Sequence, residues 1–166
     1  EIVESTELAM DDLIEMRQTE GKHLAQQLHD VTDHLSQKTE EVASRLDECL
    51  QAYQDRLTER VEELADASNV EGSPNPETLA KELAVNAEKS DIAEEITRMR
   101  SHIEQFNRVV DNERPTVGKK LEFIAQEMLR EANTMSAKLP SSDMVEIAVN
   151  IKSDVQKIRE QVRNIE

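Results

Sequence analysis

Several residue types are scarce in this 166-residue chain, and each shortage excludes a class of protein. A single cysteine, Cys49, can form neither an internal disulfide nor a thiolate zinc site, which fits a reducing cytoplasm. Three aromatic residues are too few for the stacking platforms of an RNA-recognition motif or a single-strand-binding barrel. Only three glycines and four prolines interrupt the chain, so we expect an all-helical fold.

Membrane segments and the common catalytic motifs are also missing. No apolar run approaches the roughly 20 residues that cross a bilayer, and the N-terminus has neither the basic start nor the apolar stretch of a signal peptide. A phosphate-cradling glycine loop, a Gly-x-Ser-x-Gly elbow and a Cys/His nucleophile pair are all absent. We therefore expect no membrane partner, no P-loop nucleotide hydrolysis and no acyl transfer.

The chain is instead rich in acid and in helical periodicity. It has 36 acidic against 20 basic residues, a formal net charge of −16. From Thr6 to about Asp66, apolar residues recur at helical intervals, which predicts one very long helix or two in line. Such a helix would be on the order of 90 Å long, more than a compact domain can bury. We therefore expect residues 1–67 to form a coiled-coil-like spoke that contacts another helix or another subunit.

A compact helical bundle is expected to follow the spoke. Residues 68–76 contain two prolines and a glycine and are predicted to be a turn or linker. The bundle, residues 77–166, is predicted to hold four shorter helices, at about 76–88, 91–113, 117–138 and 142–165. Asp91 with Glu94 resembles a capping pair, and breaks are expected at Pro115–Gly118 and Pro140–Asp143.

Positive charge is concentrated in one part of the bundle. Residues 1–71 hold 6 basic and 19 acidic side chains, whereas residues 98–120 hold six basic and three acidic ones. A phosphate-binding surface, if the chain has one, is expected in the second segment. The alternative is that these residues form an ordinary solvated helix surface.

Two sets of polar residues could bind a ligand or take part in catalysis. On the predicted helix from residue 91, one strip of four residues could bind a metal or a phosphate, or could form ordinary ion pairs. Its members are Asp91, Glu95, Arg98 and His102. On the next helix Glu127 and Glu131 lie four residues apart and share a face, a spacing that suits a hard divalent cation but also exposed helix pairs.

Three stretches of sequence resemble one known family. They are Val117-Gly-Lys-Lys-Leu-Glu-Phe-Ile-Ala-Gln-Glu-Met-Leu-Arg-Glu-Ala-Asn-Thr134, Arg98-Met-Arg-Ser-His-Ile-Glu-Gln-Phe106 and Lys157-Ile-Arg-Glu-Gln-Val-Arg-Asn-Ile-Glu166. These stretches are similar to the YicC family of bacterial endoribonucleases, and Met16-Arg-Gln-Thr-Glu-Gly21 extends the resemblance to about residue 5. The family's N-terminal domain would precede Glu1, so the chain is expected to be the C-terminal part of such a protein.

The resemblance implies a cytoplasmic, divalent-metal-dependent endoribonuclease that forms a homohexamer around RNA. We expect His102, Glu127 and Glu131 to gather around one manganese or magnesium ion and to act in catalysis. We also expect a set of residues to bind RNA: Arg98, Arg100, Lys119, Lys120, Arg130, Asn133 and Lys138. The chain departs from the family pattern at Leu129, where an asparagine is usual, and at Met135-Ser-Ala137, where a glycine and a serine are usual.

Three alternatives remain open at the level of sequence. Cleavage could proceed without metal, with His102 as general base on the ribose 2′-hydroxyl. The fragment could bind RNA without cleaving it, because the missing domain could complete the site. Finally, the chain could be a coiled-coil scaffold whose acidic surface keeps it soluble.

Overall fold

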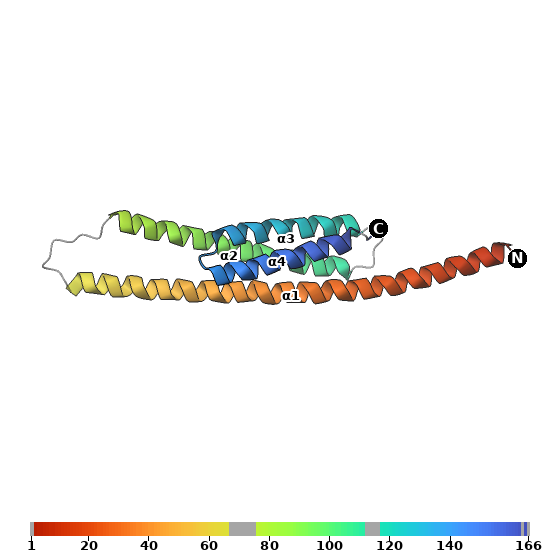
Figure 1. Ribbon diagram of the computed structural model, residues 1–166, viewed down its shortest axis with the longest axis horizontal. Helices are drawn as coiled ribbons and strands as arrows, with labels where there is room; N and C mark the ends of the chain where they lie inside the picture. Colours follow the sequence, from red (N-terminus) through yellow and green to blue (C-terminus); the bar gives the residue numbers. More distant parts are fainter. Residues whose placement is uncertain (1, 67–75, 112–116, 164, 166) are drawn as a thin grey trace.

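The computed structural model describes residues 2–66, 76–111, 117–163 and 165, with side chains described for residues 2–52, 55, 59, 91–111, 117–163 and 165. Within these ranges the chain folds into four helices: α1 (Ile2–Asp66), α2 (Pro76–Val110), α3 (Gly118–Lys138) and α4 (Ser142–Val162). Successive helices run in opposite directions (Figure 1). The expected all-helical fold is confirmed. None of the described helices is long and apolar enough to cross a membrane.

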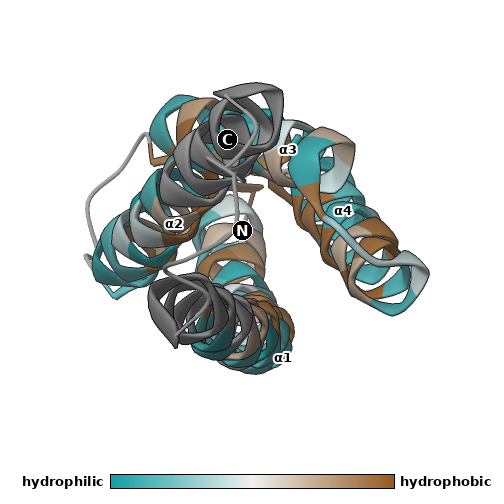
Figure 2. Cartoon of the chain, turned by 90° about the vertical axis from the view of Figure 1, so that its left-hand side faces the viewer, coloured by the Kyte–Doolittle hydropathy of each residue, from teal (hydrophilic) through white to brown (hydrophobic). Residues whose placement is uncertain are grey.

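The four helices enclose one hydrophobic core. Helix α1 packs against α2 and α4, and α3 packs against the same two helices. Seen along the bundle, the hydrophobic positions turn inward and the hydrophilic positions turn outward (Figure 2). The core includes Leu28 and Leu35 from α1, Phe106 from α2 and Met128 from α3. The middle of α1, which was expected to belong to the spoke, is therefore one of the four helices of the bundle.

The N-terminal end of α1 lies outside this core. Residues 2–23 are all exposed, and this arm projects beyond the other helices (Figure 1). Several of its exposed side chains are large and apolar: Ile2, Val3, Leu8, Met10, Leu13, Ile14 and Met16. Residues 17–23 contain no hydrophobic residue, so these side chains form an apolar stripe of their own, separate from the one that enters the core at Leu24 and Leu28.

Helix α2 differs from the sequence-based expectation. We predicted two helices, at 76–88 and 91–113, with Asp91 capping the second, and this prediction is wrong because α2 runs unbroken from Pro76 to Val110. No glycine or proline lies within the segment after Pro76, so nothing interrupts the helical hydrogen bonds. Asp91 instead contacts Lys138 at 3.4 Å. The predicted linker 68–76 lies outside the described residues except for Pro76, where α2 begins.

Helices α3 and α4 begin and end close to their expected bounds. The Oγ of Ser141 accepts a hydrogen bond from the backbone N–H of Met144, which caps the N-terminus of α4. Helix α4 ends at Val162, three residues before the predicted position. At the start of α3, Gly118 is buried against the backbone of Ile165, so that a Cβ atom here would lie 2.3 Å from the Ile165 carbonyl oxygen.

Polar contacts hold α1 on the bundle. Thr32 donates a hydrogen bond to the side-chain oxygen of Asn107 at 2.8 Å, and Arg100 donates two at 2.7 Å to the carboxylate of Glu40. On the other side of α1, the buried side chain of Asp154 on α4 has three partners. They are the ammonium groups of Lys38 at 2.8 Å and Lys157 at 2.9 Å, and the imidazole of His34 at 3.1 Å.

Candidate functional site

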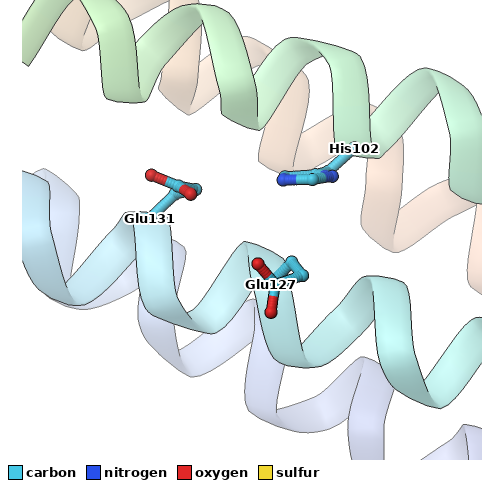
Figure 3. A group of neighbouring side chains, drawn as sticks. All are labelled: His102, Glu127 and Glu131. Carbon is cyan, nitrogen blue, oxygen red and sulfur yellow. The ribbon is translucent and has the colours of Figure 1, made fainter.

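A group of three potential metal ligands forms where α2 and α3 pack against each other. His102 comes from α2, and Glu127 and Glu131 come from consecutive turns of α3 (Figure 3). One ligand atom from each of the three side chains lies within 4.8 Å of the other two. The four-residue spacing on α3 places both carboxylates on one face, and the antiparallel packing of α2 brings the imidazole opposite them.

Glu131 is the most informative member of this group. The residue is 4% exposed, yet it makes no hydrogen bond and no ion pair with any described residue. Buried carboxylates in proteins are ordinarily paired with a cation or bound to a metal. The burial of Glu131 beside His102 therefore leaves a place for a positive charge that the described side chains do not supply.

The other two members are half-buried and largely free. Within the described part of the chain, His102 makes no hydrogen bond or ion pair. Glu127 has one weak partner, because Arg130 lies 3.8 Å away on the same helix. One imidazole and two carboxylates form a donor set that suits a divalent ion such as manganese, since imidazole suits transition metals and carboxylate suits the harder cations. The three side chains thus fit a single divalent ion.

The rest of the polar strip on α2 meets the far end of α3. Glu95 and Asp91 contact Lys138 at 3.1 and 3.4 Å, and hydrogen bonds to Glu95 and then Asp91 raise the pKa of the Lys138 ammonium group. The second carboxylate oxygen of Glu95 is buried without a hydrogen-bond partner in the described structure. Because the helices are antiparallel, this cluster lies two helical turns from the His102 group. Lys138 is therefore held by acidic side chains, while its predicted contact with RNA stays a prediction.

The arginines of the predicted phosphate surface also have acidic partners. Arg98 pairs with Glu94 one turn away on α2. Arg100 reaches across to α1, where its hydrogen bonds lower the pKa of the Glu40 carboxyl. Arg100 thus anchors α1, and the structure does not bring it to the His102 group.

Lys119 and Lys120 differ from these arginines. Both lie exposed in the first turn of α3, and neither forms an ion pair with a described residue. Asn133 is exposed near the other end of the helix. Two lysines in a first turn that carries no acidic residue are unfavourable for the helix dipole but favourable for a bound anion.

One exposed side chain received no role from the sequence. Phe123 lies on α3 with 65% of its surface exposed, although helix spacing placed most apolar side chains of this helix in the core. Its position outside the apolar stripe of Leu121, Ile124 and Met128 is the sequence signal that could have identified it.

Comparisons with known proteins agree with the resemblance in the sequence. Residues 42–166 match the family described as "Endoribonuclease YicC-like, C-terminal". The chain is 36% identical over 163 residues to a protein of Clostridioides difficile named probable endoribonuclease YicC, covering 98% of this chain and 54% of that protein. It is 33% identical over 92 residues to the protein of the same name from Haemophilus influenzae, covering 55% of this chain and 32% of that protein.

These matches define which part of a longer protein the chain resembles. It spans about half the length of the Clostridioides difficile relative, although nearly all of its own residues take part in that match. The family match covers part of α1 and all of α2, α3 and α4, including the three potential metal ligands. This chain belongs to the YicC-like endoribonuclease family and matches its C-terminal region.

Proposed function

We propose that this chain provides the metal-dependent cleavage site of an endoribonuclease that acts on single-stranded or structured RNA. His102, Glu127 and Glu131 would together bind one divalent ion, manganese or magnesium. The observation that carries this proposal is the buried residue Glu131, whose carboxylate lies beside His102 and Glu127 and has no partner among the described side chains. The names of the two relatives support RNA as the substrate.

The chemistry follows from the donor set. A bound divalent ion lowers the pKa of a coordinated water or hydroxyl and offsets negative charge on a phosphate. Glu127 and Glu131 supply the charge that holds such an ion, and the half-buried position of His102 lets its imidazole bind while the site stays open to RNA. Imidazole is a better ligand for manganese than for magnesium, so we expect manganese to support higher activity.

Two exposed lysines are proposed to hold the RNA backbone. Lys119 and Lys120 lie about two turns before Glu127 on the same helix, and no described acidic side chain neutralises them. Phosphate contacts of this kind position RNA without reading its sequence. Arg130, Asn133 and Lys138 lie farther along α3 and are proposed to contact the same strand.

Assembly into a homohexamer in the cytoplasm is part of the proposal. The exposed apolar side chains between Ile2 and Met16 of α1 support an oligomer, because an apolar surface of this extent is normally covered in a stable protein. The unpaired Cys49 and an RNA substrate are compatible with a reducing cytoplasm.

A cleavage assay tests the proposed activity. A labelled RNA that contains both single-stranded and hairpin segments is incubated with the purified chain in EDTA, in magnesium and in manganese. We expect cleavage only with metal, and we expect Glu127→Gln and His102→Ala to reduce it to the level seen in EDTA. Glu122→Gln, which removes an exposed carboxylate from the same helix, is the matched control and should leave the rate unchanged.

Other outcomes of the assay point to the alternatives. Cleavage that persists in EDTA and is lost in His102→Ala would support the imidazole as a metal-free general base. RNA binding without cleavage under any condition would support a binding role for this part of the protein. If the chain neither binds nor cleaves RNA, the result would support the scaffold role.

A further inference from the structure

Phe123 exposes a flat aromatic ring on the surface of α3. It is 65% exposed, whereas the other phenylalanine, Phe106, is completely buried in the core. Burying an aromatic side chain stabilises a fold, and the exposed ring of Phe123 does not make this contribution. Single exposed apolar residues are common, so exposure alone does not indicate a function. The residues next to Phe123 on the helix are what indicate one.

The neighbours of Phe123 on the helix are the residues of the proposed cleavage site. Lys120 lies three residues before it and Glu127 four residues after it, spacings that place side chains next to each other on a helix. The ring thus lies between an exposed cation with no described acidic partner and one of the three potential metal ligands. From Lys120 to Glu127 the helix rises about 10 Å, so the three groups can contact one short piece of substrate.

The ring of Phe123 can add affinity for RNA in a chain whose net charge is unfavourable for RNA binding. Its net charge of −16 opposes RNA, and most arginines of the predicted phosphate surface are already paired with acids. Stacking on a base adds affinity without charge, because every base has a π-face. Recognition of unpaired RNA commonly uses this contact.

We infer that Phe123 binds RNA by stacking on one unpaired base next to the phosphate that is cleaved. The substrate is therefore a single-stranded segment or a loop, and the contact is tolerant of base identity because stacking does not read hydrogen-bonding edges. This inference rests on the proposed function. One ring serves one base, so it does not conflict with the exclusion of multi-aromatic RNA-binding modules.

A fluorescence titration tests the stacking directly. The chain contains no tryptophan, so Phe123→Trp introduces a single indole reporter. It is combined with Glu127→Gln to prevent cleavage and titrated with a single-stranded oligoadenylate. The matched control is Val149→Trp in the same background, which places an indole at an exposed apolar position of α4. We expect RNA to quench the indole at position 123 but not the one at 149, and an RNA duplex to quench neither.

Binding affinities of further variants separate stacking from a general apolar contact. In the Glu127→Gln background, Phe123→Ala and Phe123→Leu should each weaken binding of single-stranded RNA about 10-fold or more, whereas Phe123→Tyr should bind like the parent. Light scattering on each variant checks that its assembly is unchanged.

Three results would overturn the inference about Phe123, and the experiments distinguish them. If the parent binds RNA but Phe123→Ala or Phe123→Leu binds equally well, the stacking role is wrong and the proposed function stands. If Phe123→Ala changes the mass of the assembly, the ring belongs to a contact between copies and the inference is again overturned. If the parent binds no RNA at all, the proposed function fails and the inference fails with it.

Discussion

At the scale of single residues, Glu131 combines high burial of the residue with the lack of a partner. Burying a carboxylate side chain without a compensating cation costs free energy of folding. Residue Glu131 is 4% exposed, and its carboxylate has only an imidazole and a second carboxylate beside it as potential co-ligands within the described structure. A divalent ion would offset this cost, so we interpret the burial of Glu131 as support for the proposed metal.

The two exposed lysines of α3 give a prediction about salt. Replacing Lys119 and Lys120 by alanine should weaken binding to single-stranded RNA of any sequence, because both are exposed and have no described ion-pair partner. Loss of two phosphate contacts should reduce the magnitude of the slope of log K against log salt by about 1.4. A filter-binding titration from low to high salt measures it.

A matched control accompanies this measurement. Lys22→Ala removes an exposed lysine from the α1 arm and should leave both affinity and slope unchanged. An unchanged slope in the double variant would show that RNA binds elsewhere.

The sequence predicted part of the residue-level site. Helical spacing placed Glu127 and Glu131 on one face, and the family resemblance added His102 from another helix. The partners of the arginines could not be predicted, since the contact of Arg100 with Glu40 depends on how α2 lies against α1. Nor did spacing alone reveal that Glu131 is buried, because burial depends on the neighbouring helix.

At the scale of elements, Asp154 joins α4 to α1. Its carboxylate is buried and contacts Lys38 of α1 and Lys157 of its own helix. Burial raises the pKa of Asp154, but the two ammonium groups lower it by more, so it lies below its ordinary value of 3.8. The folded chain therefore keeps this carboxylate charged at a pH where the unfolded chain binds a proton.

Asp154→Asn should make the fold less stable and less sensitive to acid. At neutral pH we expect a loss of about 2 kcal/mol in the free energy of unfolding, the usual contribution of a charged hydrogen bond. In the parent, the contribution of Asp154 is present above pH 3.8 and is lost as the pH falls through the lower, folded pKa. The difference between parent and variant should therefore shrink in acid, as measured by urea unfolding at pH 7, 5 and 3. A difference that is constant with pH would contradict the charged pairing.

The start of α3 depends on a glycine for a different reason. Alanine is normally the better helix residue by about 1 kcal/mol. At Gly118, however, the added Cβ would lie 2.3 Å from the carbonyl oxygen of Ile165, and backbone must move to relieve the contact. We expect Gly118→Ala to destabilise the chain by about 1–3 kcal/mol in denaturant unfolding.

Gly21→Ala is the control for this prediction. Gly21 lies on the exposed part of α1, where an added Cβ would have nothing within 4 Å, so the substitution should stabilise the helix or leave it unchanged. Equal effects of both substitutions would show that the contact with Ile165 does not limit residue 118.

The predicted helix boundaries agree with the structure only where a helix-breaking or capping residue is present. Both ends of α3 and the start of α4 lie close to their predicted positions because proline, glycine and a serine cap lie there, whereas α4, which has no such residue at its C-terminal end, ends three residues early. The predicted break at Asp91 was wrong, since an Asp and a Glu three residues apart also occur inside helices. Asp91 lies in the middle of α2 and contacts Lys138, a tertiary contact that local sequence does not specify.

At the scale of the whole molecule, the uncovered arm of α1 is the main structural feature that a single chain leaves unexplained. Met10, Leu13 and Ile14 belong to an exposed apolar stripe on this arm, which residues 17–23 separate from the stripe that packs into the core from Leu24 onward. Another copy of the chain covering this stripe would account for it, in line with the proposed oligomer.

We predict that the chain is not a monomer at micromolar concentration. Light scattering should give a mass above the 18.9 kDa of one chain. Leu13→Glu combined with Ile14→Glu should shift the mass toward one chain, because it places two charges in the apolar stripe. Glu15→Gln is the control on the same turn, and circular dichroism should show unchanged helix content in both variants. A parent mass of 18.9 kDa would contradict the assembly.

The central claim is that His102, Glu127 and Glu131 bind one divalent ion, and manganese binding tests it most directly. The metal-stripped chain is titrated with Mn²⁺ at physiological salt, and free Mn²⁺ is followed by electron paramagnetic resonance. We predict one tight ion per chain, its loss in Glu131→Gln, and its retention in Glu122→Gln, which changes net charge equally. The same number of tight ions in parent and Glu131→Gln, or none in the parent, would contradict the account.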